Sequence, residues 1–110
     1  MKNLEFSLLL DYYGEMLTEK QREVMELYYN EDLSLAEISL LSHVTRQGVR
    51  DTIKRGEAAL LEWEEKLGTA ARARLVKEGL GKIAALCREH PESENEKKIL
   101  RLAEDLAGSL

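Results

Sequence analysis

Three times in this 110-residue chain, a Ser or Thr is followed three positions later by Glu or Gln. In such a capping box the hydroxyl accepts a hydrogen bond from the third helical amide, and the longer side chain accepts one from the amide of the cap residue. Each box therefore predicts the start of a helix, and three helix starts in so short a chain favour an all-α fold. The pairs are Thr18 with Gln21, Ser34 with Glu37, and Ser93 with Glu96.

Two further caps and the spacing of the apolar residues complete the predicted set of helices. Asn3 and Thr45 stand before apolar residues that recur every three or four positions, the period of a helix with one buried face. Leu, Glu, Ala, Lys and Arg dominate the chain and favour helices, and the single proline, Pro91, marks a stop. We expect helices over residues 4–16, 19–30, 35–42, 46–67 and 70–89, and a last helix after Ser93.

The third and fourth predicted helices have the spacing of a helix-turn-helix. Thr45, the cap of the second helix of the pair, stands eleven positions after Ser34, the cap of the first, and this leaves room for one short helix and a tight turn. The motif also needs apolar residues inside both helices and in the turn, and all of these positions are filled. They are Ile38, Val44, Val49 and Ile53.

The rest of the chain predicts a second region and an assembly. Gly68 can end the long fourth helix and Thr69 can cap the next, so we expect a helix-turn-helix domain over residues 1–68 and a helical hairpin over 69–110. The hairpin packs either on the same core or on a dimer partner. We expect a homodimer, because the apolar stripe exceeds what one small chain easily covers; the alternative is a hairpin that folds back within one chain. The stripe comprises Leu60, Leu61, Trp63, Leu67, Ile99, Leu102 and Leu106.

Basic residues gather on the second helix of the predicted motif. Residues 33–56 hold four basic and two acidic residues, a net +2, whereas the 32 residues before them hold three basic and eight acidic ones, a net −5. Arginine and glutamine pair with base edges, so this helix is the expected nucleic-acid-binding surface, the alternative being an ordinary solvated helix face. The predicted site residues are Arg46, Gln47, Arg50, Lys54 and Arg55.

Other functional classes find little support in the residues. No nucleophile with a base beside it, no glycine-rich phosphate loop and no metal-ligand spacing occurs, so we expect no enzyme, no metal and no cofactor. The lone Cys87 allows no internal disulfide, and the apolar run near the start is too short for a membrane span or a signal peptide. A cytoplasmic protein without membrane insertion is the expectation.

The segment LTEKQREVMELYYNEDLSLAEISLLSHVTRQGVRDTIKR resembles region four of bacterial sigma factors. With its flanking sequence, over residues 4–68, it is more similar to the YlxM family of small bacterial helix-turn-helix proteins, which are associated with the signal recognition particle pathway. The resemblance implies a sigma-region-four-like helical fold, a regulatory role in binding nucleic acid, and no catalysis. DNA is the expected partner. The alternative is an interaction protein that binds the protein or RNA of the particle.

Two positions depart from the family pattern. Ser42 stands where a large apolar residue is usual, and His43 stands where Gly or Asn is usual in the turn. We expect His43 to tolerate a left-handed backbone conformation and Ser42 to weaken the contact between the helices. Leu40 and Leu41, usually polar in the family, either supply that contact or remain exposed for a partner.

Overall fold

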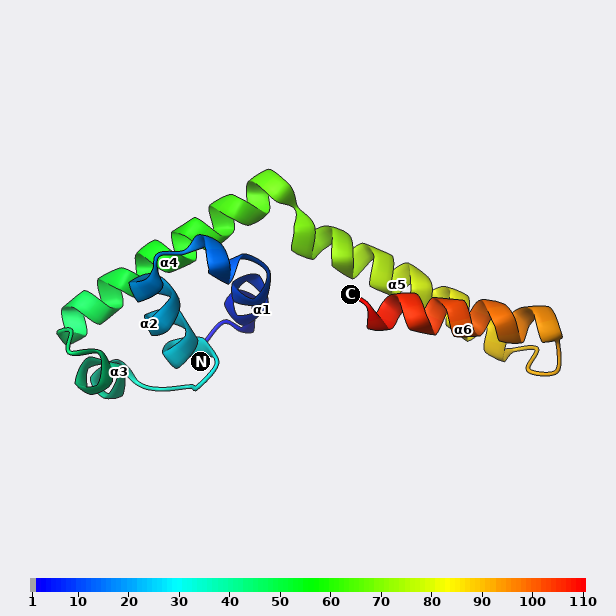
Figure 1. The fold of residues 1–110 in the computed structure, drawn as a ribbon, viewed down its shortest axis with the longest axis horizontal. Coiled ribbons are helices and arrows are strands. Elements are labelled where there is room, and N and C mark those ends of the chain that lie inside the picture. The colour runs from blue at the N-terminus through cyan, green and yellow to red at the C-terminus, as the bar shows by residue number, and fades with distance from the viewer. Residues whose placement is uncertain (1) are drawn as a thin grey trace. The chain divides into compact units, whose positions relative to one another are not determined.

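The computed structural model describes residues 2–110, and its elements are helices (Figure 1). None of the residues described lies in a strand, and the predicted all-α fold is confirmed. Nor does this part of the chain contain a helix long and apolar enough to cross a membrane. The elements are α1 (Leu4–Tyr13), the 3-10 helix η1 (Gly14–Met16), α2 (Glu19–Tyr29), α3 (Leu35–Ser42), α4 (Arg46–Leu67), α5 (Thr69–Arg88) and α6 (Glu94–Gly108).

The predicted caps start most of these helices. Thr18 and Ser34 form complete capping boxes, in which the side chains of Gln21 and Glu37 accept from the cap amides. The hydroxyl of Ser93 accepts from the amide of Glu96 at 3.4 Å. The prediction for Thr69 is wrong: this residue is already the first of α5, and its amide donates to the hydroxyl of a tyrosine in α1.

The chain forms two compact units, Met1–Ala70 and Ala71–Leu110. In the first unit, α1, α2 and α3 all pack against α4, which is the longest helix and supplies one side of the core. The largest side chains with almost no solvent exposure come from all four helices. They are Leu9, Tyr13, Val24, Met25, Ile38, Val49 and Leu60.

Two residues of the expected apolar stripe belong to this core instead of to a free surface. Leu60 is fully buried, and Trp63 is partly buried and packs against the core cluster. They lie on the inner face of α4, because helical spacing puts them on the same side as Val49 and Ile53. Only Leu61 and Leu67 of the α4 stripe are exposed.

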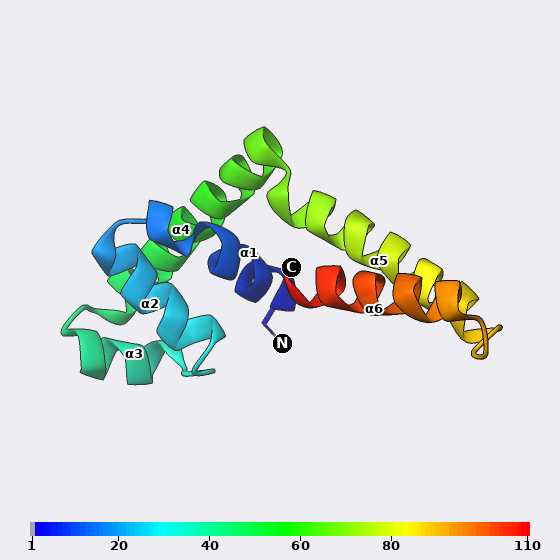
Figure 2. The ribbon, with the colours of Figure 1, turned by 45° about the vertical axis from the view of Figure 1, so that its right-hand side comes forward.

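The second unit contains most of α5 and all of α6. Both ribbon views show these helices side by side and running in opposite directions (Figures 1 and 2). The buried residues of this unit are small: Ala84 and Cys87 on α5, and Ala103 on α6. Arg88 and Glu104 form an ion pair across the hairpin at 3.6 Å.

Candidate nucleic-acid interface

The turn between α3 and α4 sets the position of the second helix of the motif. His43 ends α3 in the left-handed region, with φ 58° and ψ 31°, so the prediction for this residue is confirmed. The hydroxyl of Ser39 donates to the carbonyl of Val44 at 2.5 Å, which joins α3 to the turn. The turn is therefore held by a hydrogen bond from the first helix, in addition to its own backbone geometry.

Ser42 is buried, although it stands where an apolar residue is usual. Its hydroxyl donates to the carbonyl of Ile38 at 2.7 Å, so the buried oxygen has a partner. Its carbonyl accepts a hydrogen bond from the ammonium group of Lys20, in α2, at 3.1 Å. A positive charge here also suits the C-terminal end of the α3 dipole, so Lys20 ties α2 to the turn.

The N-terminus of α4 is capped and closely packed. The hydroxyl of Thr45 accepts from the amide of Gly48 at 3.0 Å. A Cβ atom at Gly48 would lie 2.7 Å from a methyl carbon of Val44, so the turn leaves no room for a larger residue there. The capped end therefore has a defined direction, and the positive end of the α4 dipole lies beside Arg46.

The predicted site residues lie on two neighbouring ridges of α4, and all five are exposed. Residues four apart stack along a helix, so one ridge is wholly basic and the next is mixed, with Asp51 at its centre. The amide of Gln47 donates to Asp51 at 3.0 Å. The basic ridge consists of Arg46, Arg50 and Lys54, and the mixed ridge consists of Gln47, Asp51 and Arg55.

A small hollow lies beside the basic ridge. Arg50 and Lys54 line it together with Tyr28, Leu35, Ile53 and Glu57. The Glu57 carboxylate accepts a hydrogen bond from the hydroxyl of Tyr29. Burial raises the pKa of Tyr29 above its ordinary value, and the bond to Glu57 raises this pKa further. The phenol therefore remains protonated at neutral pH and keeps one carboxylate oxygen of Glu57 engaged.

Lys2 holds the loop between α2 and α3. Its ammonium group donates to the carbonyls of Tyr28 at 2.7 Å and Leu33 at 2.6 Å, and lies 4.0 Å from the centre of the Tyr28 ring. It also pairs with Asp32 at 3.2 Å. The loop between α2 and α3 is thus anchored by the start of the chain. No local sequence signal predicts the bonds of Lys2 to Tyr28 and Leu33 or the bond of Lys20 to Ser42, because these partners lie 20 or more positions away.

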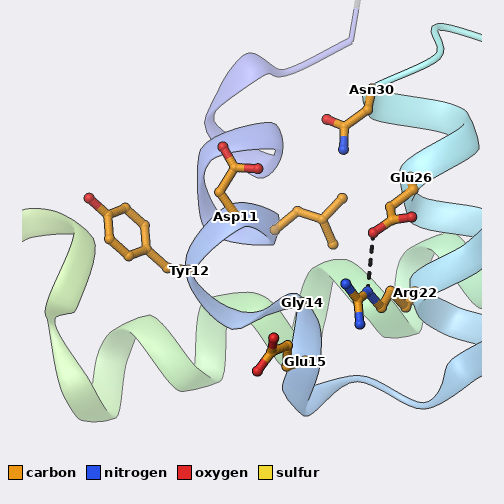
Figure 3. Close-up of a pocket in the computed structure, with 8 residues that line it drawn as sticks. Asp11, Tyr12, Gly14, Glu15, Arg22, Glu26 and Asn30 are labelled. Atoms are coloured by element: carbon orange, nitrogen blue, oxygen red, sulfur yellow. Dashed lines mark hydrogen bonds and ion pairs between the residues drawn. The ribbon is translucent and has the colours of Figure 1, made fainter. Parts of the chain in front are cut away.

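A second hollow, between α1 and α2, has the opposite charge (Figure 3). Asp11, Glu15 and Glu26 line it, and its one cation, Arg22, pairs with Glu26 at 3.1 Å. A phosphate would meet carboxylates here, so this side of the unit does not suit nucleic acid. The remaining residues around it are Leu10, Tyr12, Gly14 and Asn30.

Two leucines on α3 point into solvent. Leu40 is 79% exposed and Leu41 is 60% exposed, so neither supplies the contact expected beside Ser42. Tyr28 and Tyr29, in contrast, are partly buried against the core and meet edge to face, with ring centres 5.0 Å apart. This position favours packing over base stacking as the role of the two tyrosines.

Comparison with known proteins identifies the family. The family described as "Putative helix-turn-helix protein, YlxM / p13 like" matches residues 1–100, nearly the whole length. The chain belongs to this family. A UPF0122 protein of Thermoanaerobacter sp. strain X514 is 45% identical over 104 residues, which are 94% of this chain and 89% of the relative. A UPF0122 protein of Clostridium novyi strain NT is 54% identical over 69 residues, or 63% of this chain and 60% of the relative.

The resemblance to the YlxM family that the motifs suggested is therefore confirmed. The family description names a helix-turn-helix, and in this member α3, the His43 turn and α4 have that geometry. The match extends well past α4 and includes all of α5 and the start of α6.

Proposed function

We propose that this protein binds nucleic acid, with DNA as the first candidate, through the N-terminal half of α4. The observation that carries the proposal is the basic ridge of Arg46, Arg50 and Lys54, which starts at a capped helix end. Residues 1–70 hold eight basic and fourteen acidic residues, a net −6, so this ridge is a local exception. A polyanion approaching the unit is favoured at this face and repelled at the acidic hollow of Figure 3.

The proposed contacts follow from position along the helix. Arg46, next to the cap, and Lys54, two turns further on, would contact phosphates, while Gln47 and Arg50 would contact base edges in the major groove. Arg55 lies about 100° around the helix from Lys54 and would contact the backbone at the edge of the groove. Asp51 releases Gln47 when the amide turns to a base.

Fluorescence anisotropy with duplex DNA at several salt concentrations tests this proposal. We expect Arg50→Ala to weaken binding by about 1–3 kcal/mol, roughly five- to 150-fold, and to relax sequence preference. We expect Lys54→Ala to weaken binding to all sequences alike and to reduce the salt slope by about one.

The matched control for these variants is Arg22→Ala. This substitution removes the same charge from the same unit, but at the acidic hollow, so affinity should change little. If Arg46→Ala and Arg50→Ala both leave binding intact in a folded protein, the ridge is only a solvated surface and the proposal fails.

The second candidate function is an interaction protein of the signal recognition particle pathway. Exposed Leu40 and Leu41 on α3, together with the net charge of −5, favour a protein partner over a bare polyanion. The same titration, repeated with the particle's RNA and protein, separates the two functions: a steep salt slope on DNA selects the first. In both cases we propose a cytoplasmic protein that is not an enzyme.

Assembly and domain organisation are part of the proposal. A single helix-turn-helix usually gains affinity by pairing, so we propose a homodimer that places two α4 helices on two half-sites. We further propose that residues 1–68 act as the helix-turn-helix domain and residues 69–110 as a separate hairpin.

A further inference from the structure

The hairpin of α5 and α6 has an apolar face that its own two helices leave uncovered. On α5, Leu75, Ile83 and Leu86 are 70%, 42% and 62% exposed, at helical spacings of eight and three. On α6, Ile99, Leu102 and Leu106 are 45%, 63% and 56% exposed, at spacings of three and four. Such spacings place each set on one side of its helix. We call these six residues the hairpin face.

Both sets lie on the same side of the hairpin. On α5 the exposed row is about 110° from the inward row that holds Ala84 and Cys87, and on α6 it is about 70° from Ala103, in the same rotational sense. Two antiparallel helices are related by a two-fold axis perpendicular to the plane of the pair. Rotations in the same sense therefore bring the two rows to one face of the hairpin, where they form one apolar surface.

The other side of the hairpin is charged. Helical spacing places Arg74 and Lys77 of α5 there, with Lys97 and Arg101 of α6, and the Arg88–Glu104 ion pair spans the two helices. The hairpin is thus amphipathic as a whole, with one wet side and one side suited to burial. Its own core consists of three small buried residues in a unit of 40 residues, and its lone cysteine cannot form an internal disulfide. A unit of this size usually needs association for stability.

We propose that the hairpin face pairs with the same face of a second copy and forms a four-helix bundle. The face has the required size: α5 and α6 are ~30 and ~22 Å long and ~10 Å wide, so two faces bury roughly 1,000 Å², the lower limit for a specific interface. The charge is also suitable, because residues 71–110 hold eight basic and seven acidic residues and two nearly neutral hairpins do not repel. The pseudo-two-fold symmetry of the face makes it self-complementary.

This proposal deepens the homodimer of the proposed function, on which it rests, and assigns the interface to the hairpin. Leu60 and Trp63, which the sequence placed in the dimer stripe, are committed to the core of the first unit and take no part. The two copies then join through α5 and α6, and none of the residues of the basic ridge belongs to the hairpin face.

Light scattering and sedimentation equilibrium of the full chain test the proposal. The wild type should have twice the monomer mass of 12.6 kDa at tens of micromolar. Leu102→Glu should raise the dimer dissociation constant by about 100-fold or more, because each dimer would bury two charges in place of two leucines. The matched control is Leu40→Glu, which makes the same change at a more exposed leucine on α3 and should leave the mass unchanged.

A second measurement covers the case in which Leu102→Glu unfolds the hairpin. The helical circular dichroism of the wild type should melt at a temperature that rises with protein concentration, as for any structure that two copies share. A wild-type monomer whose melting is independent of concentration would overturn the proposal. The hairpin face would then be covered within one chain or by another partner. A Leu102→Glu dimer would place the interface elsewhere. Failure of nucleic-acid binding in a protein that remains dimeric would refute the proposed function alone.

Discussion

Gly56 of α4 packs directly against Met25 of α2. A Cβ atom built there would lie 2.9 Å from both Cγ and Sδ of Met25, and Met25 is fully buried. In an isolated helix, Gly56→Ala would stabilise by about 1 kcal/mol, because alanine is the better helix former. Here the methyl group overpacks a core, which costs about 1–3 kcal/mol. The clash involves atoms in the middle of the methionine chain, so we take the upper half of that range and expect a net loss of about 1–2 kcal/mol.

Trp63 provides the assay, because it is the only tryptophan in the chain and packs on the core of the first unit. Urea unfolding followed by its fluorescence therefore reports the unit that contains Gly56. Two comparisons separate the gain in helix propensity from the cost of overpacking. Ala58→Gly, at an exposed position of the same helix, measures helix propensity alone and should cost about 1 kcal/mol.

The second comparison uses Met25→Val, which shortens the blocking side chain. In that background Gly56→Ala should become stabilising, and the double-mutant cycle should show a coupling of about 1–3 kcal/mol. A wild-type background in which Gly56→Ala is stabilising, or a cycle with no coupling, would refute the argument that this contact requires glycine.

Two further predictions concern the junction after α4 and the proposed interface. Tyr13→Phe should lower the free energy of unfolding by about 1–3 kcal/mol, because its buried hydroxyl donates to Glu64 at 2.5 Å and accepts from the amide of Thr69 at 3.0 Å. Urea unfolding measures this loss, and Tyr12→Phe, which removes a more exposed hydroxyl, is the control; equal losses would contradict the assignment. Asp51→Asn should strengthen DNA binding about two- to fivefold, because it removes a negative charge between basic residues while an amide remains beside Gln47. Anisotropy that shows unchanged or weaker binding would contradict the assigned DNA face.

Local chemistry made the helix starts predictable from the sequence. A cap such as Ser34 bonds to amides within its own first turn, so both partners lie within a few residues of each other. Residue type and spacing alone therefore predict the interaction. The same holds for His43, which the turn places at positive φ and which tolerates that conformation better than most residues. The basic ridge was predictable for a similar reason, since residues four apart share a side of any helix.

Long-range contacts were not predictable in this way. The bond from Lys20 to Ser42 and the bonds from Lys2 to the α2–α3 loop depend on how helices cross, and nothing at either position signals them. The error over Thr69 has the same origin. Its amide already has a partner, the hydroxyl of Tyr13, 56 positions earlier, so α5 starts one residue sooner than a local cap would place it.

The two proposals together account for a charge pattern that neither explains alone. A unit with a net charge of −6 is repelled by nucleic acid at long range, and one basic ridge of three side chains offsets this only within about a Debye length, ~8 Å at physiological salt. A single copy should therefore bind weakly and discriminate poorly. Joining two copies through a nearly neutral hairpin makes the second contact intramolecular and raises affinity without adding non-specific positive charge. Because each copy alone binds weakly, only a DNA site that offers a half-site to both copies should be bound tightly. The dimer should therefore prefer sites with two matching halves over random sequence.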